Sequence, residues 1–168
     1  MNEHARDRLT ARNATNVSLG YTGTGWQFRH SFLGDAQRDP RLWVPASNPY
    51  DWVGADLYSG PDGSVVDYGG TGLDVNGDSK PGNPDRAVSL AQLRSLDLWV
   101  PEWGVYQSSN DDQDVTAFYD WYIDNQAVVK GMIYYNRSVG SDDFKFHPSG
   151  QADARRDEWV SIFSTLNG

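Results

Sequence analysis

Apolar residues gather in four short runs along the chain, and each run is followed by a turn or a polar stretch. The runs are apolar throughout more than alternating, which is typical of parallel strands covered on both faces. They are "NVSLGY" (16–21), "WVGADLY" (52–58), "LWVPEW" (98–103) and "GMIYY" (131–135).

In the segments around these runs, apolar residues recur at the spacing of an α-helix. Asn83 is a suitable N-cap for a helix that begins at Pro84, and acidic residues open the segment from residue 111, as suits a helix N-terminus. The pattern predicts helices over residues 2–11, 84–96, 111–126 and 152–166. The alternation of strands and helices indicates an α/β fold with right-handed crossover units.

Composition limits the class of protein. With 168 residues and no internal repeat, the chain is expected to form a single domain over residues 1–168. The net charge is -9 and the basic residues are scattered, which argues against a nucleic-acid partner. No apolar stretch is long enough to span a membrane or to act as an export signal, and cysteine is absent, so disulfides and thiolate chemistry are excluded.

A glycine-, aspartate- and proline-rich loop over residues 59–85 follows the second strand. Loops of this length inside a domain are usually functional or disordered. Part of it follows a calcium-loop pattern, with oxygen ligands at positions 1, 3, 5 and 12 supplied by Asp74, Asn76, Asp78 and Asp85. Ser79 replaces the glycine expected at position 6, so the alternative is a solvated acidic loop without metal. No other cofactor is indicated.

A carboxylate ends the third predicted strand. In barrels of parallel strands, catalytic groups sit at the C-terminal ends of strands, and Glu102 has this position, as have Asp56 and Tyr58 on the second strand. A carboxylate there can act as nucleophile or base on a sugar. The alternative is a structural salt bridge to an arginine at the rim. Aromatic residues make up 13% of the chain, and Trp26, after the first strand, is a candidate for stacking on a sugar or for packing.

Four segments together resemble a known family. "NATNVSLGYTGTGW", "NPYDWVGADLYS", "LWVPEWGV" and "VKGMIYYN", in this order, resemble the second half of a glycoside hydrolase of the family 26 type, the mannanase-like barrels. The resemblance implies that Glu102 is the catalytic nucleophile, that Tyr58 hydrogen-bonds it, and that Asp56 lies on the same strand end. It gives Trp103 an aromatic position in the motif, for packing or sugar contact, and makes Tyr135 a candidate aromatic under the sugar.

The same resemblance implies a fold and a function. The fold is a partial (β/α)8 barrel, with about four parallel strands and their covering helices. The function is that of a retaining β-glycoside hydrolase acting on β-mannan or β-glucan, a polysaccharide-degrading, secreted and extracellular protein. The alternative is a non-catalytic carbohydrate-binding or assembly module.

The family's acid/base glutamate has no match in this chain. It ends the fourth strand of the barrel, before the "TNV" segment, and a retaining enzyme needs it to protonate the leaving oxygen. We therefore expect weak or no hydrolysis by the chain alone. A half barrel also leaves open edges, so we expect self-association or pairing with a missing N-terminal half.

Overall fold

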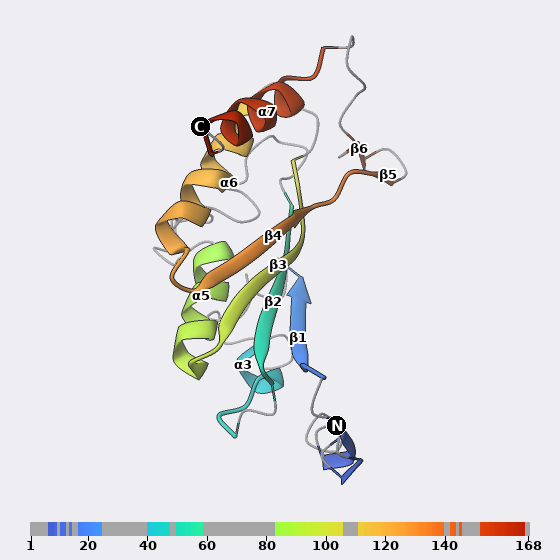
Figure 1. Cartoon of the computed structure of the whole chain (residues 1–168), viewed down its shortest axis with the longest axis vertical. Coiled ribbons are helices and arrows are strands. Elements are labelled where there is room, and N and C mark those ends of the chain that lie inside the picture. Colours follow the sequence, from blue (N-terminus) through green and yellow to red (C-terminus); the bar gives the residue numbers. More distant parts are fainter. Residues whose placement is uncertain are drawn as a thin grey trace.

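Four parallel strands form the centre of the structure, which is a computed structural model (Figure 1). It describes residues 7–9, 11–12, 14, 17–24, 40–47, 50–58, 83–105, 111–139, 142–143, 145 and 152–166. In chain order the elements are β1 (Gly20–Thr24), α3 (Pro40–Trp43), β2 (Trp52–Tyr58), α5 (Asn83–Arg94), β3 (Asp97–Gly104), α6 (Asp111–Asn125), β4 (Val129–Tyr134), β5 (Ser138–Val139), β6 (Asp142–Asp143) and α7 (Ala154–Leu166). The sheet order is β1-β2-β3-β4, and every neighbouring pair is parallel.

The predicted α/β fold is confirmed, with strands alternating with helices as in half of a barrel. The boundaries of β2, α5, α6 and α7 match the predicted segments closely. The first strand begins at Gly20 instead of residue 16, and residues 7–9 and 11 are helical. The short helix α3 and the antiparallel pair β5–β6 were not predicted.

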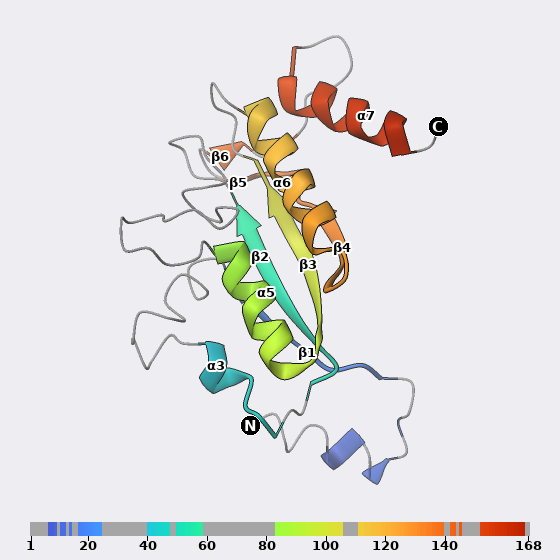
Figure 2. The same ribbon diagram turned by 90° about the vertical axis from the view of Figure 1, so that its left-hand side faces the viewer.

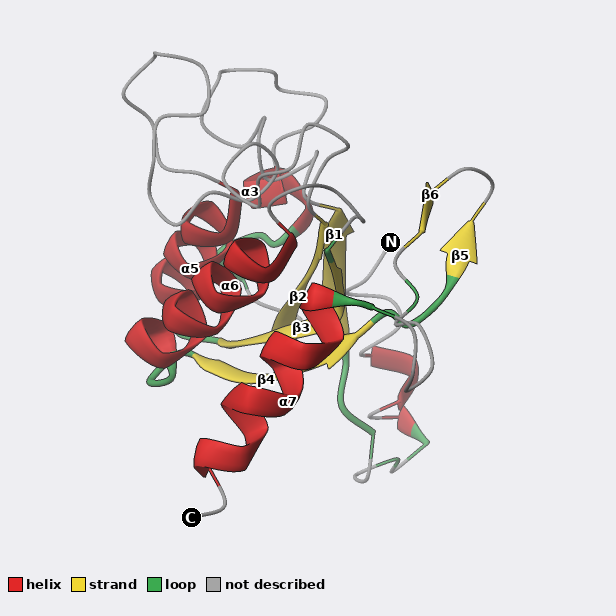
Figure 3. Ribbon diagram, turned by 90° about the horizontal axis from the view of Figure 1, so that it is seen from above, coloured by secondary structure: helices red, strands yellow, loops and turns green. Residues whose placement is uncertain are grey.

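The helices cover one face of the sheet (Figures 2 and 3). Side chains alternate along a strand, so every second one points at α5 and α6. Val53, Ala55 and Leu57 of β2 point that way and are fully buried. The same core also contains Leu98 and Val100 of β3, Ala87, Leu90 and Ala91 of α5, and Val115, Phe118 and Trp121 of α6.

The opposite face of the sheet, which we call the open face, carries Trp52, Asp56, Trp99, Glu102 and Ile133. None of the helices in the described ranges packs on it. Trp99 is 43% exposed and Ile133 is 63% exposed. The expectation that both faces are covered is therefore wrong for these residues: β3 alternates between exposed and buried positions along its first half.

Glycines let two tryptophan rings lie against the open face. A Cβ atom on Gly20 would collide with the indole ring of Trp52, its register partner on β2. A Cβ atom on Gly131 would lie 2.8 Å from the ring of Trp99, its partner on β3. In both pairs the ring occupies the space that any other residue would need.

The turn from α5 into β3 fixes where the third strand starts. Ser95 has a left-handed backbone (φ 54°), and the Leu96 N–H donates to the Ala91 carbonyl at 2.9 Å. The Ser95 N–H donates to Gln92 at 3.1 Å, which completes a Schellman cap. β3 therefore begins directly after the helix ends.

Gly20→Ala is expected to lower the free energy of unfolding by about 1–3 kcal/mol, because the added methyl group displaces the Trp52 ring. Urea unfolding measures the change. In a Trp52→Ala background the same substitution should cost much less, since the space is then empty. An equal cost in both backgrounds would contradict the packing argument.

Candidate functional site

Two carboxylates lie side by side at the C-terminal ends of β2 and β3. Asp56 and Glu102 are register partners, and neighbouring strands run about 4.8 Å apart. Asp56 is partly buried and Glu102 is exposed. The structure thus brings together two of the residues that the sequence pointed to.

An extra residue in β3 puts Glu102 on the open face. Gly54 pairs with Trp99 and Asp56 pairs with Glu102, so Val100 and Pro101 together stand opposite Ala55 alone. This is a β-bulge, and beyond it the alternation of side chains is reversed. Without the bulge, Glu102 would point at the helices and Trp103 at the open face. Proline suits such a position, since the bulged residue need not donate to the ladder.

Burial and, to a smaller degree, the negative charge of Glu102 together raise the pKa of Asp56 to about 6. Asp56 Oδ1 is buried and has no hydrogen-bond partner within the part of the chain that the structure describes. A buried carboxyl oxygen without a donor costs free energy, so this group is suited to receive a hydrogen bond from a bound molecule. It is also a carboxyl that holds a proton at mildly acidic pH.

Trp103 lies next to Glu102 in sequence but on the other side of the sheet. Its side chain is fully buried. The ring centroid is 4.7 Å from that of Phe118, 4.9 Å from Tyr134 and 5.1 Å from Trp159. The packing role therefore replaces the sugar contact that was the other interpretation of this residue. The four rings join β3, β4, α6 and α7 directly behind the carboxylate.

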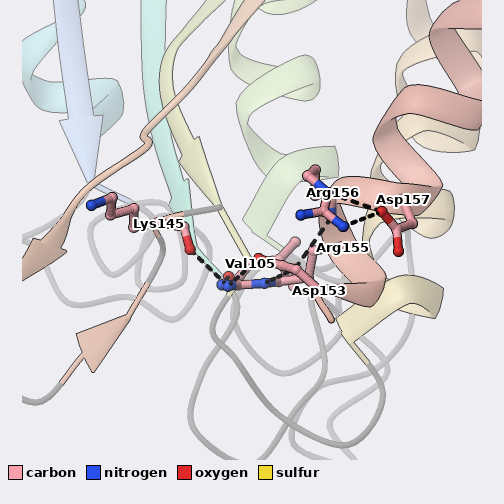
Figure 4. A network of polar contacts seen from close by, with 6 residues as sticks. All are labelled: Val105, Lys145, Asp153, Arg155, Arg156 and Asp157. Carbon is pink, nitrogen blue, oxygen red and sulfur yellow. Dashed lines mark hydrogen bonds and ion pairs between the residues drawn. The ribbon is translucent and has the colours of Figure 1, made fainter. Parts of the chain in front are cut away.

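A buried ion pair lies just beyond the end of β3 (Figure 4). The Arg155 and Asp153 side chains are both completely buried, with Nε of the arginine 3.1 Å from Oδ1 of the aspartate. Arg155 also donates to the carbonyl of Val105 at 2.9 Å and to that of Lys145 at 2.9 Å. Asp153 accepts from the Arg156 N–H at 3.3 Å, which makes it the N-cap of α7. Sequence reasoning missed this arginine, because a charged residue in the first turn of a helix resembles a solvated one.

The remaining candidates are placed unevenly. Tyr58 ends β2 and pairs with Gly104 in the register. The Tyr135 N–H donates to the Trp103 carbonyl at 2.7 Å, which extends the β3–β4 pairing by one bond beyond β4. Trp26 lies outside the described residues.

Three residues of the calcium pattern, Asp74, Asn76 and Asp78, also lie outside the described ranges. The fourth, Asp85, is in the first turn of α5 and accepts from Trp121 Nε1 at 3.0 Å. Burial raises the pKa of Asp85, and the Trp121 hydrogen bond opposes this. Among the residues that are described, no three acidic or histidine side chains are grouped to hold a metal ion. No described helix is both long and apolar enough to cross a membrane.

The fold is similar to that of one solved structure of a glucanase. It is an endo-β-1,4-glucanase from Xanthomonas axonopodis pv. citri, crystallised with three substitutions, and it is 17% identical to this chain with a TM-score of 0.48. The match covers 84% of this chain and 44% of the glucanase chain, so the chain spans less than half of that protein. At this level of similarity the glucanase assigns no role to any residue here. No family model and no curated protein matches the sequence.

Asp56→Asn is expected to stabilise the protein at neutral pH. Folding raises this pKa from 3.8 to about 6, so the folded state binds more protons than the unfolded state between these values. The contribution of Asp56 to stability therefore falls as the pH rises through this window, and above it the ionised carboxylate opposes folding. We expect a gain of about 1 kcal/mol near pH 7.5, well below the full shift because the carboxyl is partly exposed to solvent, and a smaller gain near pH 4.

Urea unfolding at both pH values measures this gain. Asp120→Asn, an exposed position on α6, controls for the loss of one negative charge. A variant that is less stable than wild type at both pH values would mean that Asp56 has a stabilising partner when ionised.

Proposed function

We propose that this chain is a retaining β-glycoside hydrolase-like domain that acts on a β-linked polysaccharide, β-mannan or β-glucan, with Glu102 as its nucleophile. The observation that carries the proposal is the Asp56–Glu102 pair at the C-terminal ends of two adjacent parallel strands. Strand ends of this kind hold the reacting groups in barrel enzymes, and a carboxyl with a raised pKa, here that of Asp56, is typical of functional sites.

The proposed reaction begins with attack by the Glu102 carboxylate on the anomeric carbon. A bond forms between a Glu102 oxygen and this carbon, and the bond to the leaving oxygen breaks with its electron pair going to that oxygen. Water then hydrolyses the glycosyl ester and restores the carboxylate. Asp56 Oδ1, buried without a donor among the described residues, accepts a hydrogen bond from a sugar hydroxyl.

The leaving oxygen also needs a proton. Asp56 stands beside Glu102 on the neighbouring strand, whereas a retaining acid acts from the other side of the scissile bond. The resemblance assigns that acid to a segment with no counterpart here. We therefore propose that the chain reacts with activated glycosides and only weakly with polysaccharide. Localisation outside the cell follows from the proposed substrate and rests on the resemblance.

The second candidate is a carbohydrate-binding or assembly module without turnover. The exposed indole ring of Trp99 on the open face favours it, because aromatic rings serve as stacking surfaces for sugars. Two measurements together separate the candidates. A binding module is retained on insoluble mannan or cellulose, and Glu102→Gln is retained as well as wild type. It forms no covalent intermediate, whereas the hydrolase does.

Trapping the intermediate tests the leading proposal. A 2-deoxy-2-fluoro glycoside with a dinitrophenyl leaving group needs little protonation, and its fluorine slows hydrolysis of the ester. We expect wild type to gain one fluoroglycosyl unit by intact mass, with the manno or gluco reagent identifying the sugar, and peptide mapping to place it on Glu102. Glu102→Gln should gain none.

Asp97→Asn is the matched control, because Asp97 is an exposed carboxylate at the opposite end of the same strand. It should label like wild type. A folded wild type that gains no mass with either sugar would overturn the assignment of Glu102 as nucleophile.

The labelling rate should depend on pH through Asp56. The transition state carries positive charge on the sugar, and ionised Asp56 stabilises it, so the rate should rise as the pH passes through about 6. Asp56→Asn should label without this inflection. The rate of adduct formation, followed by mass spectrometry from pH about 4.5 to about 8, measures it. An unchanged inflection in Asp56→Asn would assign the titration to another group.

A further inference from the structure

We propose that Arg155 is a positioning residue for Glu102: it fixes the path of the chain just beyond the carboxylate and so sets the direction from which Glu102 meets a sugar. The proposal rests on the proposed function of Glu102. It adds a residue on α7 that neither the sequence pattern nor the resemblance assigns to the site.

Arg155 joins three separate segments of the chain (Figure 4). Its Nη1 donates to the Val105 carbonyl at 2.9 Å, just past β3, and its Nη2 donates to the Lys145 carbonyl at 2.9 Å. Nε donates to Oδ1 of Asp153 at 3.1 Å, and Nη2 donates to Oδ2 at 3.2 Å. A planar guanidinium can hold these partners at once, whereas an ammonium group cannot.

The contact with Val105 reaches Glu102 through a short stretch of β3. Trp103 follows Glu102 and is locked by its ring contacts, but Gly104 has no side chain to hold it. Val105 is the next residue, and its side chain is fully buried. Ladder pairing with Tyr58 and Tyr135 also holds this strand end. Arg155 adds a hydrogen bond to the Val105 carbonyl, which fixes the chain just beyond the ladder.

Helix capping alone does not explain these contacts. Asp153 caps α7 through the Arg156 N–H and would do so without Arg155. The neighbouring Arg156 shows what a merely local arginine does here: its guanidinium pairs with exposed Asp157 at 2.6 Å. Arg155 instead buries its charge and donates to carbonyls far along the chain. Burying this charge costs free energy, which is offset only when the partners are held in a fixed geometry.

Precise placement of a nucleophile matters more for its rate than for binding of the sugar. A misplacement of about 1 Å can cost about 100-fold in rate, whereas binding contacts made elsewhere persist. Loss of a positioning residue should therefore slow covalent labelling at saturating reagent and leave the reagent's affinity almost unchanged.

Labelling kinetics with the 2-fluoro reagent measure both quantities. For Arg155→Gln we expect the maximal labelling rate to fall about 100-fold while the half-saturating concentration changes by less than about threefold. Arg155→Lys keeps the positive charge and can still donate to one of the partners, so it should recover part of the labelling rate. Arg156→Gln is the matched control and should label like wild type. All rates are measured well below the unfolding temperature found for each variant.

A second measurement separates failure of this proposal from failure of the proposed function. Amide hydrogen exchange needs no reaction at Glu102. In Arg155→Gln, exchange should speed up at residues 103–105 and stay unchanged at residues 98–100 of the same strand. If wild type forms no adduct, the nucleophile assignment fails and exchange alone decides whether Arg155 holds the strand end.

Two outcomes would overturn the positioning role. One is an Arg155→Gln protein that melts at a lower temperature but labels at the wild-type rate. The other is unchanged exchange at residues 103–105. Should Arg155→Gln fail to fold, Arg155→Lys and Asp153→Asn carry the same test. Asn keeps one acceptor oxygen for the N-cap and removes the charge of the pair and one of its two hydrogen bonds with Arg155.

Discussion

The arrangement of side chains around the site depends on one extra residue in β3. A strand sends its residues alternately to opposite faces, so a shift by one exchanges core and surface. Val100 and Pro101 share one position opposite Ala55, and this exchange takes place within the strand. Before it, Leu98 and Val100 face the helices, and after it, Trp103 does. A single backbone irregularity thus keeps the core continuous and still delivers Glu102 to the side where Asp56 lies.

Ionised Asp56 is costly to the fold, and buried side chains pack behind the neighbouring strand that carries Glu102. Asp56 is partly desolvated beside a like charge, and one of its oxygens has no donor in the described part of the chain. A buried charged group of this kind generally reduces stability, and the loss is recovered elsewhere. Here the four aromatic rings behind β3 and the buried Arg155–Asp153 pair stand directly behind and beyond the site.

The sequence predicted the parts of this fold that repeat a regular pattern. α5, α6 and α7 have apolar residues at helical spacing, and the β2 run is bounded by polar residues, so their limits were recognisable. β1 was misplaced because its residues, "GYTGT", carry little apolar signal, and the strand is defined by pairing with β2. α3 and the β5–β6 pair are too short for any periodicity to identify.

The positions of some candidate site residues could be predicted from the sequence, whereas the burial and contacts of others depend on the folded structure. The strand-end position of Glu102 was predictable, and so was its nearness to Asp56, because the C-terminal ends of adjacent parallel strands meet. The burial of Trp103 was not, because its face depends on a bulge that the sequence marks only by Pro101. Arg155 was beyond prediction for a different reason: its partners at Val105 and Lys145 are brought to it only by the folded chain.

The open face has an optical consequence. Trp99 exposes 43% of its surface there, while Trp103 and Trp121 are buried in the core. Indole fluorescence shifts to shorter wavelength when water is displaced from the ring, so the emission of Trp99 responds to anything that settles on this face. The buried rings, and the exposed ring of Trp43 on α3, supply the background against which that change is read. The protein thus carries, on the open face, an intrinsic probe of whether that face is occupied.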